Sequence, residues 1–367
     1  MMPQTQADSP REMSLRPESS PDASTAFFEE AYRVFSAAQA AAGSIERTFS
    51  IADYEVRLQF AGPALMSATT TALTHLAARP SDTPDLTVCI WDSASTGVPM
   101  IPPAWPADAY GPHGMIRGFN TERFQTIVQR ANNSLNMLDH DRNIALYWIP
   151  DVARVTYYET ISPLRTLLFW WMNRNARQLV HAGAVGTPDG GVLLPAKGGS
   201  GKSTTALACL EAGFLYVGDN NVLLNDDQRP TRAYSVYNST SLHGANLEER
   251  LPRFVPMIEN LDRLERQKAF GFLYKQYPTQ MVRSLPIRAV LVPRVTGYRD
   301  TEISGSSAGT SLNALVPSTV LSLPGAGRET VEILSRLLEP LPHYTLKLGT
   351  ELSQIPRTIS DLLRTSR

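Results

Sequence analysis

The stretch LLPAKGGSGKSTTALACLEAGFLYVGDNNVLL, residues 193–224, constrains the fold of this chain more than any other part of it. An apolar run typical of a buried strand leads into a glycine-rich turn, and a helical pattern follows directly and ends at Gly213. A second apolar run then reaches Asp219. This alternation of strand and helix predicts an α/β layer built on a largely parallel sheet.

The glycine-rich turn matches the phosphate-binding loop G-x-x-x-x-G-K-[ST], with Ala196 in place of the first glycine. Glycines let the backbone N–H groups approach phosphate oxygens, and the following helix N-terminus adds partial positive charge. We expect Lys202 to reach the β- and γ-phosphates of ATP and Ser203 to bind Mg²⁺. The alternative is a glycine-rich turn with a fortuitous Lys-Ser. The expected nucleotide-binding residues are Lys197, Gly198, Gly199, Ser200, Gly201, Lys202, Ser203 and Thr204.

Asp219 follows the second strand of this unit. If both strands run parallel, their carboxyl ends meet at the edge of the sheet that also carries the loop. The carboxylate can then face the γ-phosphate, where it either binds Mg²⁺ or accepts a proton from an attacking hydroxyl. The alternative is a turn residue that bonds its own backbone in Asp-Asn-Asn.

The stretch LVHAGAVGTPDGGVLLPAKGGSGKSTTALACLEAGFLYVGDNNVLL resembles the core of the HPr kinase/phosphorylase family, whose nucleotide fold is related to phosphoenolpyruvate carboxykinase. More loosely, residues 316–356 are similar to the tails of divergent relatives. The resemblance implies that His181 lies near the phosphates and that Asp219 acts as the general base. Relatives carry a second aspartate where this chain has Asn220, which puts metal affinity and the phosphate-removing activity in doubt. Without the resemblance, a lone histidine at the start of a strand more often has a structural role than a catalytic one.

The chain of 367 residues is long enough for two domains. Residues 1–24 are polar and rich in Pro and Ser, and we expect them to be a disordered lead-in. A mixed α/β module at 25–160, a candidate for substrate recognition, begins with a helix at 25–42 and contains a long loop at 96–114. A helix at 163–179 leads into the domain that resembles the kinase family, residues 161–367.

The formal net charge of −1 offers no general attraction to nucleic acid or to an anionic membrane. Cys89 and Cys209 are the two cysteines, which argues against a disulfide framework and favours a reducing, cytoplasmic compartment. The most apolar helical stretch, LRTLLFWWM, is too short to cross a bilayer. The sequence does not decide the oligomeric state, and a homo-oligomer is one of the states it allows.

Two further segments are weaker candidates. The basic, aromatic segment ERQKAFGFLYKQYPTQMVRS could clamp phosphate or dock an acidic peptide, or it could be a solvated helical face. A loop near residue 243 could have a substrate role. The residues concerned are Arg266, Lys268, Lys275 and Arg283 in the first segment, and His243 and Gly244 in the second.

The sequence therefore favours an ATP- and Mg²⁺-dependent kinase that phosphorylates a Ser or Thr hydroxyl. The resemblance implies HPr or a small protein like it as the acceptor, or a precursor peptide, since divergent relatives serve in peptide natural-product pathways. A catalytically silent ATP-binding regulator, suggested by Ala196 and Asn220, and a small-molecule kinase on the same fold are the alternatives. A motor or switch NTPase is disfavoured because only one helix separates Lys202 from Asp219.

Overall fold

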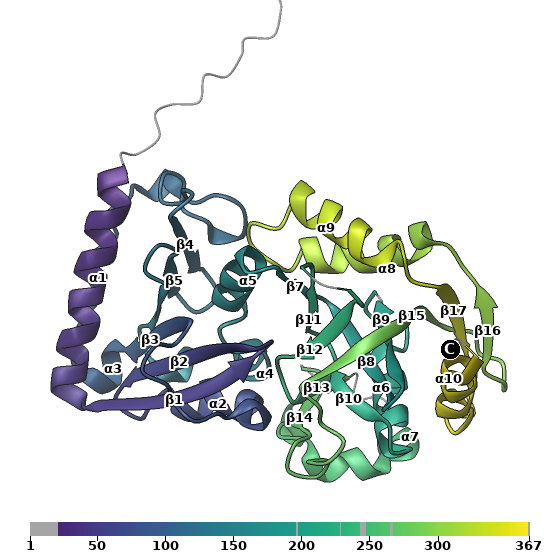
Figure 1. Cartoon of the computed structure of the whole chain (residues 1–367). Coiled ribbons are helices and arrows are strands. Elements are labelled where there is room, and N and C mark those ends of the chain that lie inside the picture. The colour runs from purple at the N-terminus through teal and green to yellow at the C-terminus, as the bar shows by residue number, and fades with distance from the viewer. Residues whose placement is uncertain (1–20, 196, 228, 243–246, 265–266, 366–367) are drawn as a thin grey trace, which may run out of the picture.

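A computed structural model describes residues 21–195, 197–227, 229–242, 247–264 and 267–365. Two mixed sheets carry the architecture, one built from residues 44–149 and the other from residues 177–348 (Figure 1). The structure is therefore mixed α/β, as the sequence predicts. Four residues named above, Ala196, His243, Gly244 and Arg266, lie outside the described ranges.

The first sheet has the strand order β1-β2-β3-β6-β5-β4 within the described residues. Strands β2, β3 and β6 run parallel and the other neighbours are antiparallel. Short helices α2 and α3 connect the strands, together with 3-10 turns. The bounds are β1 Ser44–Ile51, β2 Tyr54–Ala61, α2 Met66–Thr70, β3 Leu86–Asp92, α3 Ser93–Thr96, β4 Phe124–Gln129, β5 Ser134–Asp139 and β6 Ile144–Ile149.

Helix α1 (Pro21–Ala42) packs against β2 and β3 of this sheet and stands at its side in Figure 1. It begins ahead of Thr25, so the prediction of a disordered lead-in through residue 24 is wrong for residues 21–24. Phe28 and Phe35 are fully buried, and the Phe35 ring lies 5.5 Å from that of Trp91 in β3. Their spacing of seven residues places both rings on one face of the helix. Apolar packing therefore holds α1 on the sheet.

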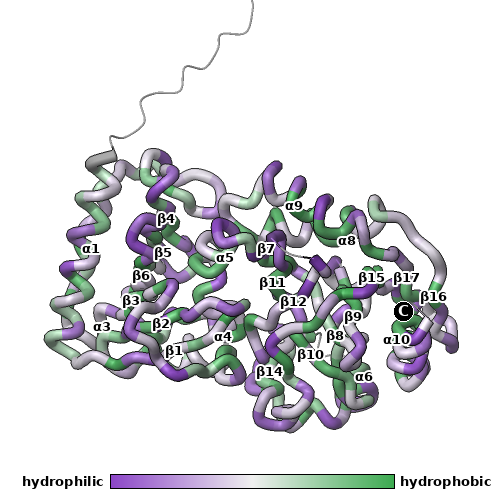
Figure 2. Tube along the Cα trace, viewed as in Figure 1, coloured by the Kyte–Doolittle hydropathy of each residue, from purple (hydrophilic) through white to green (hydrophobic). Residues whose placement is uncertain are grey.

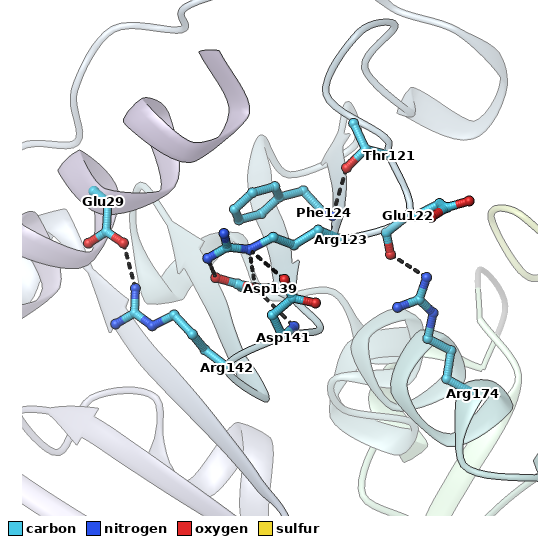
Figure 3. Close-up of polar contacts among 9 residues, drawn as sticks. All are labelled: Glu29, Thr121, Glu122, Arg123, Phe124, Asp139, Asp141, Arg142 and Arg174. Carbon is cyan, nitrogen blue, oxygen red and sulfur yellow. Dashed lines mark hydrogen bonds and ion pairs between the residues drawn. The ribbon is translucent and has the colours of Figure 1, made fainter. Parts of the chain in front are cut away.

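Charged side chains close the end of this sheet where β5 turns into β6 (Figure 3). Arg142 forms an ion pair with Glu29 of α1 at 2.6 Å. Arg123 donates from Nε and Nη2 to the two oxygens of Asp139, at 2.9 and 2.7 Å. The Asp139 side chain is fully buried, so the two-pronged contact compensates its desolvation.

The second half begins with α4 (Tyr157–Ile161) and α5 (Arg165–Arg174), a helix whose middle is buried throughout. We predicted a helix to residue 179, and this is wrong at its end. Asn175 terminates α5, Ala176 has a positive φ of 54°, and β7 (Arg177–Val180) follows. A left-handed residue cannot continue an α-helix, and so the chain turns into the sheet there.

The second sheet has the main strand order β10-β8-β9-β15-β12-β11-β7 within the described residues, and β17 and β16 extend it beside β15. A separate pair, β13 with β14, lies next to it. The bounds are β8 Ala182–Thr187, β9 Gly190–Pro195, β10 Leu215–Gly218, β11 Val222–Asn225, β12 Arg232–Ser235, β13 Ser239–Leu242, β14 Ala269–Phe272, β15 Ser284–Val295, β16 Glu302–Gly305 and β17 His343–Leu348.

Helices cover both faces of this sheet. On one face lies α6, packed by α10, and on the other lie α8 and α9. Strand β9 shows why both faces need a cover, because Val192 and Leu194 belong to the cluster around α6 while Leu193 belongs to the cluster around α8 and α9. The bounds are α6 Lys202–Glu211, α7 Leu247–Arg250, α8 Ala308–Val320, α9 Arg328–Leu338 and α10 Gln354–Thr365.

One hydrophobic cluster joins the two halves of the molecule. It contains Leu58 of β2, Leu167 of α5 and Leu223 of β11, all fully buried. Figure 2 shows hydrophobic residues gathered around α5 and β11, between the two sheets. The second sheet and the helices on it are therefore packed against the first half through α5. None of the described helices is both long and apolar enough to span a membrane.

Candidate functional site

The glycine-rich loop Lys197–Gly201 connects β9 to α6. Gly199 and Gly201 have positive φ angles of 81° and 95°. A Cβ atom on Gly201 would lie 2.3 Å from Cδ1 of Leu348, so both the backbone conformation and the close approach of β17 require glycine there. Gly201 is the N-cap of α6, and no side chain caps this helix end. The free N–H groups at the start of α6 are therefore available to an anion.

The topology places Asp219 opposite this loop. Strand β8 lies between β9 and β10 and is antiparallel to both, so β9 and β10 point the same way without pairing. The expectation that both strands run in one direction is confirmed, whereas the intervening strand is a feature that local patterns do not predict. Gly183 of β8 passes so close that its Cβ would lie 3.4 Å from Oδ1 of Asp219.

Lys202 and Asp219 form a buried ion pair at the first turn of α6. The Lys202 Nζ donates to Oδ1 of Asp219 at 2.5 Å and to Oδ1 of Asn220 at 2.8 Å. The other carboxylate oxygen accepts a bond from Thr240 at 3.4 Å, and Asn220 donates to Ser241 at 2.8 Å. The Lys202 side chain is 6% exposed and the Asp219 side chain is fully buried. The loop lysine thus neutralises the carboxylate as long as no other anion competes for it.

His181 lies at the start of β8, beside the same loop, and its backbone N–H donates to Thr319 of α8 at 3.1 Å. Burial, assisted by the nearby positive charge of Lys202, lowers the pKa of His181 to about 3. The imidazole is therefore neutral at physiological pH and can donate or accept one hydrogen bond without adding charge.

A cavity of about 200 Å³ opens between the loop, His181 and the α7 region. Cationic side chains line it and no carboxylate does among the described lining residues, since Lys202 covers Asp219. The charges come from Lys197, Lys202, Arg250 and Lys268. The site thus combines helix N–H groups with concentrated positive charge, which suits a polyphosphate.

The hydroxyl residues of the loop face different spaces. Ser203 and Thr204 line the cavity, and the Ser203 hydroxyl has no hydrogen-bond partner within the described ranges. Ser200 instead lines a neighbouring cavity of about 350 Å³ beside α8, together with Lys197 and Arg294, and its buried Oγ is unpaired in the described part of the chain.

These donors suit a metal ion that arrives with phosphate. Across the described residues, no group of three or more His, Cys, Asp or Glu side chains could hold a metal ion by itself. Mg²⁺ is commonly held by one or two protein ligands together with substrate phosphates and waters. Ser203 lines the cavity, and Asp219 would add a second oxygen ligand once Lys202 leaves it, so these residues fit Mg²⁺ that arrives with phosphate.

The sequence missed several residues that the tertiary structure brings to the site. Thr240 and Ser241 come from β13, and Arg250 comes from the short helix α7. No motif surrounds any of them, so no sequence signal could have found them. Of the basic segment, Lys268 reaches the cavity, whereas Lys275 and Arg283 are exposed and do not line it. That segment contains β14, and a solvated helical face is therefore the wrong interpretation of it.

No family model matches this chain, and no curated protein matches it. Among solved structures, one titled "Structure of the Hpr(Ser) kinase/phosphatase from Coxiella burnetii" is similar to it in part. The match has a TM-score of 0.29 and 12% sequence identity, and covers 51% of this chain and 95% of that chain. At this level the likeness does not assign a function to the chain.

Proposed function

We propose that this chain is a P-loop phosphotransferase of the HPr-kinase-like type, which moves the γ-phosphoryl group of ATP to a hydroxyl group. The observation that carries the proposal is the buried pair of Lys202 and Asp219 beside a glycine-rich helix start and a cationic cavity. Phosphoryl transfer depends on positioning and on neutralising phosphate charge, and this site offers the groups for both.

ATP binding and release of the base are coupled in this proposal. Phosphate oxygens compete with Asp219 for the ammonium group of Lys202, which lies 2.5 Å from the carboxylate in the free protein. Once Lys202 turns to the phosphates, Asp219 becomes able to accept the proton of the attacking hydroxyl. The N–H groups of the loop and of the first turn of α6 hold the phosphates in place.

Mg²⁺ would be held by Ser203 and Asp219 and would neutralise charge on the phosphates as they react. Neutral His181 adds a hydrogen bond to the phosphate or to the acceptor. Lys268 and Arg250 line the same cavity and add positive charge around the transferred group. As acceptor we propose a Ser or Thr hydroxyl on a small protein or peptide, an HPr-like protein or a natural-product precursor peptide, with residues 25–160 as the module that recognises it. We expect no nucleic acid or membrane partner.

The test is transfer of label from γ-labelled ATP with Mg²⁺, using HPr and a panel of serine-containing peptides as acceptors. Wild-type protein is expected to label a hydroxyl. Lys202→Ala should lose both ATP binding and transfer, whereas Asp219→Asn should keep ATP binding and lose transfer. Lys347→Ala, which removes a half-exposed lysine of β17, is the matched control and should behave as wild type. Transfer that persists in Asp219→Asn would refute the role of this carboxylate as base.

A catalytically silent ATP-binding regulator is the second candidate. It is favoured by one observation: Asn220, an amide, holds the Lys202 ammonium at 2.8 Å beside the single buried carboxylate of the site. This candidate predicts ATP binding that Lys202→Ala abolishes, with no transfer to any acceptor. The direct test is Asn220→Asp, which gives the site a second carboxylate. Transfer that appears in this variant would show that the amide at position 220 is what keeps the protein silent.

A further inference from the structure

A second hollow lies on the same side of the sheet, between α6, α7 and α10. Its volume is about 780 Å³, within the range of ligand-binding clefts. Apolar side chains from α6 and α10 form its floor, among them Ala208 and Pro356. Four arginines stand around it, Arg250, Arg253, Arg357 and Arg364, and we call it the arginine groove. Figure 2 shows hydrophilic residues along α10, which forms one wall.

The charge of the arginine groove is only partly neutralised. Arg253 pairs with Glu211 at 3.1 Å, and Arg364 pairs with Asp361 at 2.5 Å. Arg250 and Arg357 have no ion-pair partner in the described part of the chain, although both line the hollow. Two unpaired guanidinium groups around an apolar floor suit an occupant that carries both carboxylates and apolar atoms.

The arginine groove adjoins the cationic cavity beside the loop. Arg250 and Leu251, at the end of α7, line both spaces. An extended ligand can therefore lie in the groove and still place one of its groups beside Lys202 and Asp219. A compact metabolite held at the phosphates would have no use for the groove, whereas a polypeptide that passes over α7 would use both.

We propose that the arginine groove docks an acidic stretch of a polypeptide, next to the residue whose hydroxyl enters the cavity. That this polypeptide is the phosphate acceptor rests on the function proposed above. Charge complementarity and the two lining residues that the groove shares with the cavity support this docking role. Acidic side chains on the partner would meet Arg250 and Arg357, because the charges of Arg253 and Arg364 are already paired with Glu211 and Asp361.

The experiment measures binding separately from catalysis. Short fluorescent peptides with a central serine flanked either by Glu or by Gln are titrated with the full chain, and fluorescence anisotropy reports binding. The Glu peptide is expected to bind about tenfold more tightly than the Gln peptide at low salt, and to lose that advantage near 0.5 M salt, where the Debye length is only about 4–5 Å. Arg357→Glu should remove the preference while binding of a fluorescent ATP analogue stays unchanged.

Arg328→Glu is the matched control, because Arg328 on α9 is 92% exposed and outside the groove. This variant has the same net charge as Arg357→Glu and should keep the preference for the Glu peptide. Equal binding of the two peptides, or the same preference in Arg357→Glu as in wild type, would overturn the proposal. A single-stranded DNA oligonucleotide that displaces the Glu peptide at lower concentration than unlabelled Glu peptide would overturn it too.

The outcomes separate the groove from the kinase proposal. Label transfer that is equal for peptides flanked by Glu and by Gln refutes the docking role of the groove and leaves the kinase function standing. A preference for Glu that depends on Arg357, in a protein that never transfers label, supports the docking of an acidic polypeptide and refutes the kinase function alone.

Discussion

Removing Lys202 alone should destabilise the free protein far more than removing an ordinary lysine. Its Nζ lies 2.5 Å from Oδ1 of Asp219, and both side chains are buried. At an effective dielectric constant of about 20, two unit charges at this separation attract each other by about 7 kcal/mol before the cost of desolvation is subtracted. When one partner of a buried pair is deleted, the other charge stays buried without compensation, which costs about 3–5 kcal/mol.

The assay is urea unfolding at pH 7, followed by fluorescence of the tryptophans, for wild type, Lys202→Ala, Asp219→Asn and the double variant. Lys202→Ala is expected to lower the free energy of unfolding by at least about 3 kcal/mol. The double variant leaves no buried charge, so its loss should be smaller than the sum of the two single losses by at least about 1 kcal/mol.

Lys347→Ala serves as the control for this series as well. Lys347 is 46% exposed and lies 3.5 Å from Glu302, and an exposed pair of this kind contributes less than about 1 kcal/mol. The reasoning is refuted if Lys202→Ala costs no more than this control, or if the two single losses add up to the loss of the double variant. Either result would mean that the pair is not the buried, mutually compensating contact described above.

Three further predictions concern the loop, a histidine and a buried carboxylate. Gly201→Ala should weaken binding of a fluorescent ATP analogue by more than about tenfold, because a Cβ there is both strained and obstructed, whereas Gly305→Ala in β16, with open space around its Cβ position and away from the loop, should not. Burial lowers the pKa of His75 to about 3, so between pH 6.5 and 3 the unfolded chain binds a proton at His75 that the folded chain does not, and the folded state loses stability as pH falls. At pH 5 the loss in the free energy of unfolding is about 2 kcal/mol. In urea unfolding, the stability of His75→Gln should therefore fall less steeply with decreasing pH than that of wild type. Arg123→Ala leaves the buried Asp139 without its ion pair and should lower the urea midpoint by the equivalent of about 2 kcal/mol or more; a loss below about 0.5 kcal/mol would contradict this.

Local pattern was sufficient for the elements with strong periodicity. Helix α1 and the succession β9, α6, β10 lie where the apolar spacing and the glycine punctuation predict them. No sequence pattern singled out β4, β5, β12, β13, β14, β16 or α8. Most of these strands are only four residues long, and alternation over so short a span cannot be told from a loop.

The end of α5 shows a different limit. No glycine or proline stands between Arg174 and Leu179, so local pattern alone predicts a longer helix, whereas the chain turns at Ala176 and enters β7. Strand β7 pairs with β11, which lies more than forty residues further along the chain. That pairing is tertiary, and it overrides the local preference for helix.

The sequence by itself determined the loop, the helix that follows it and the edge of the sheet on which Asp219 lies, because these depend on glycine, on apolar periodicity and on strand direction over some thirty residues. Only the tertiary structure decided that β8 separates β9 from β10, that Lys202 rests on Asp219 and Asn220, and that Arg250 lines both the cavity and the arginine groove. These features join segments that are distant in sequence. Packing of the sheet and its helices sets them, and no local preference encodes which distant side chains will meet.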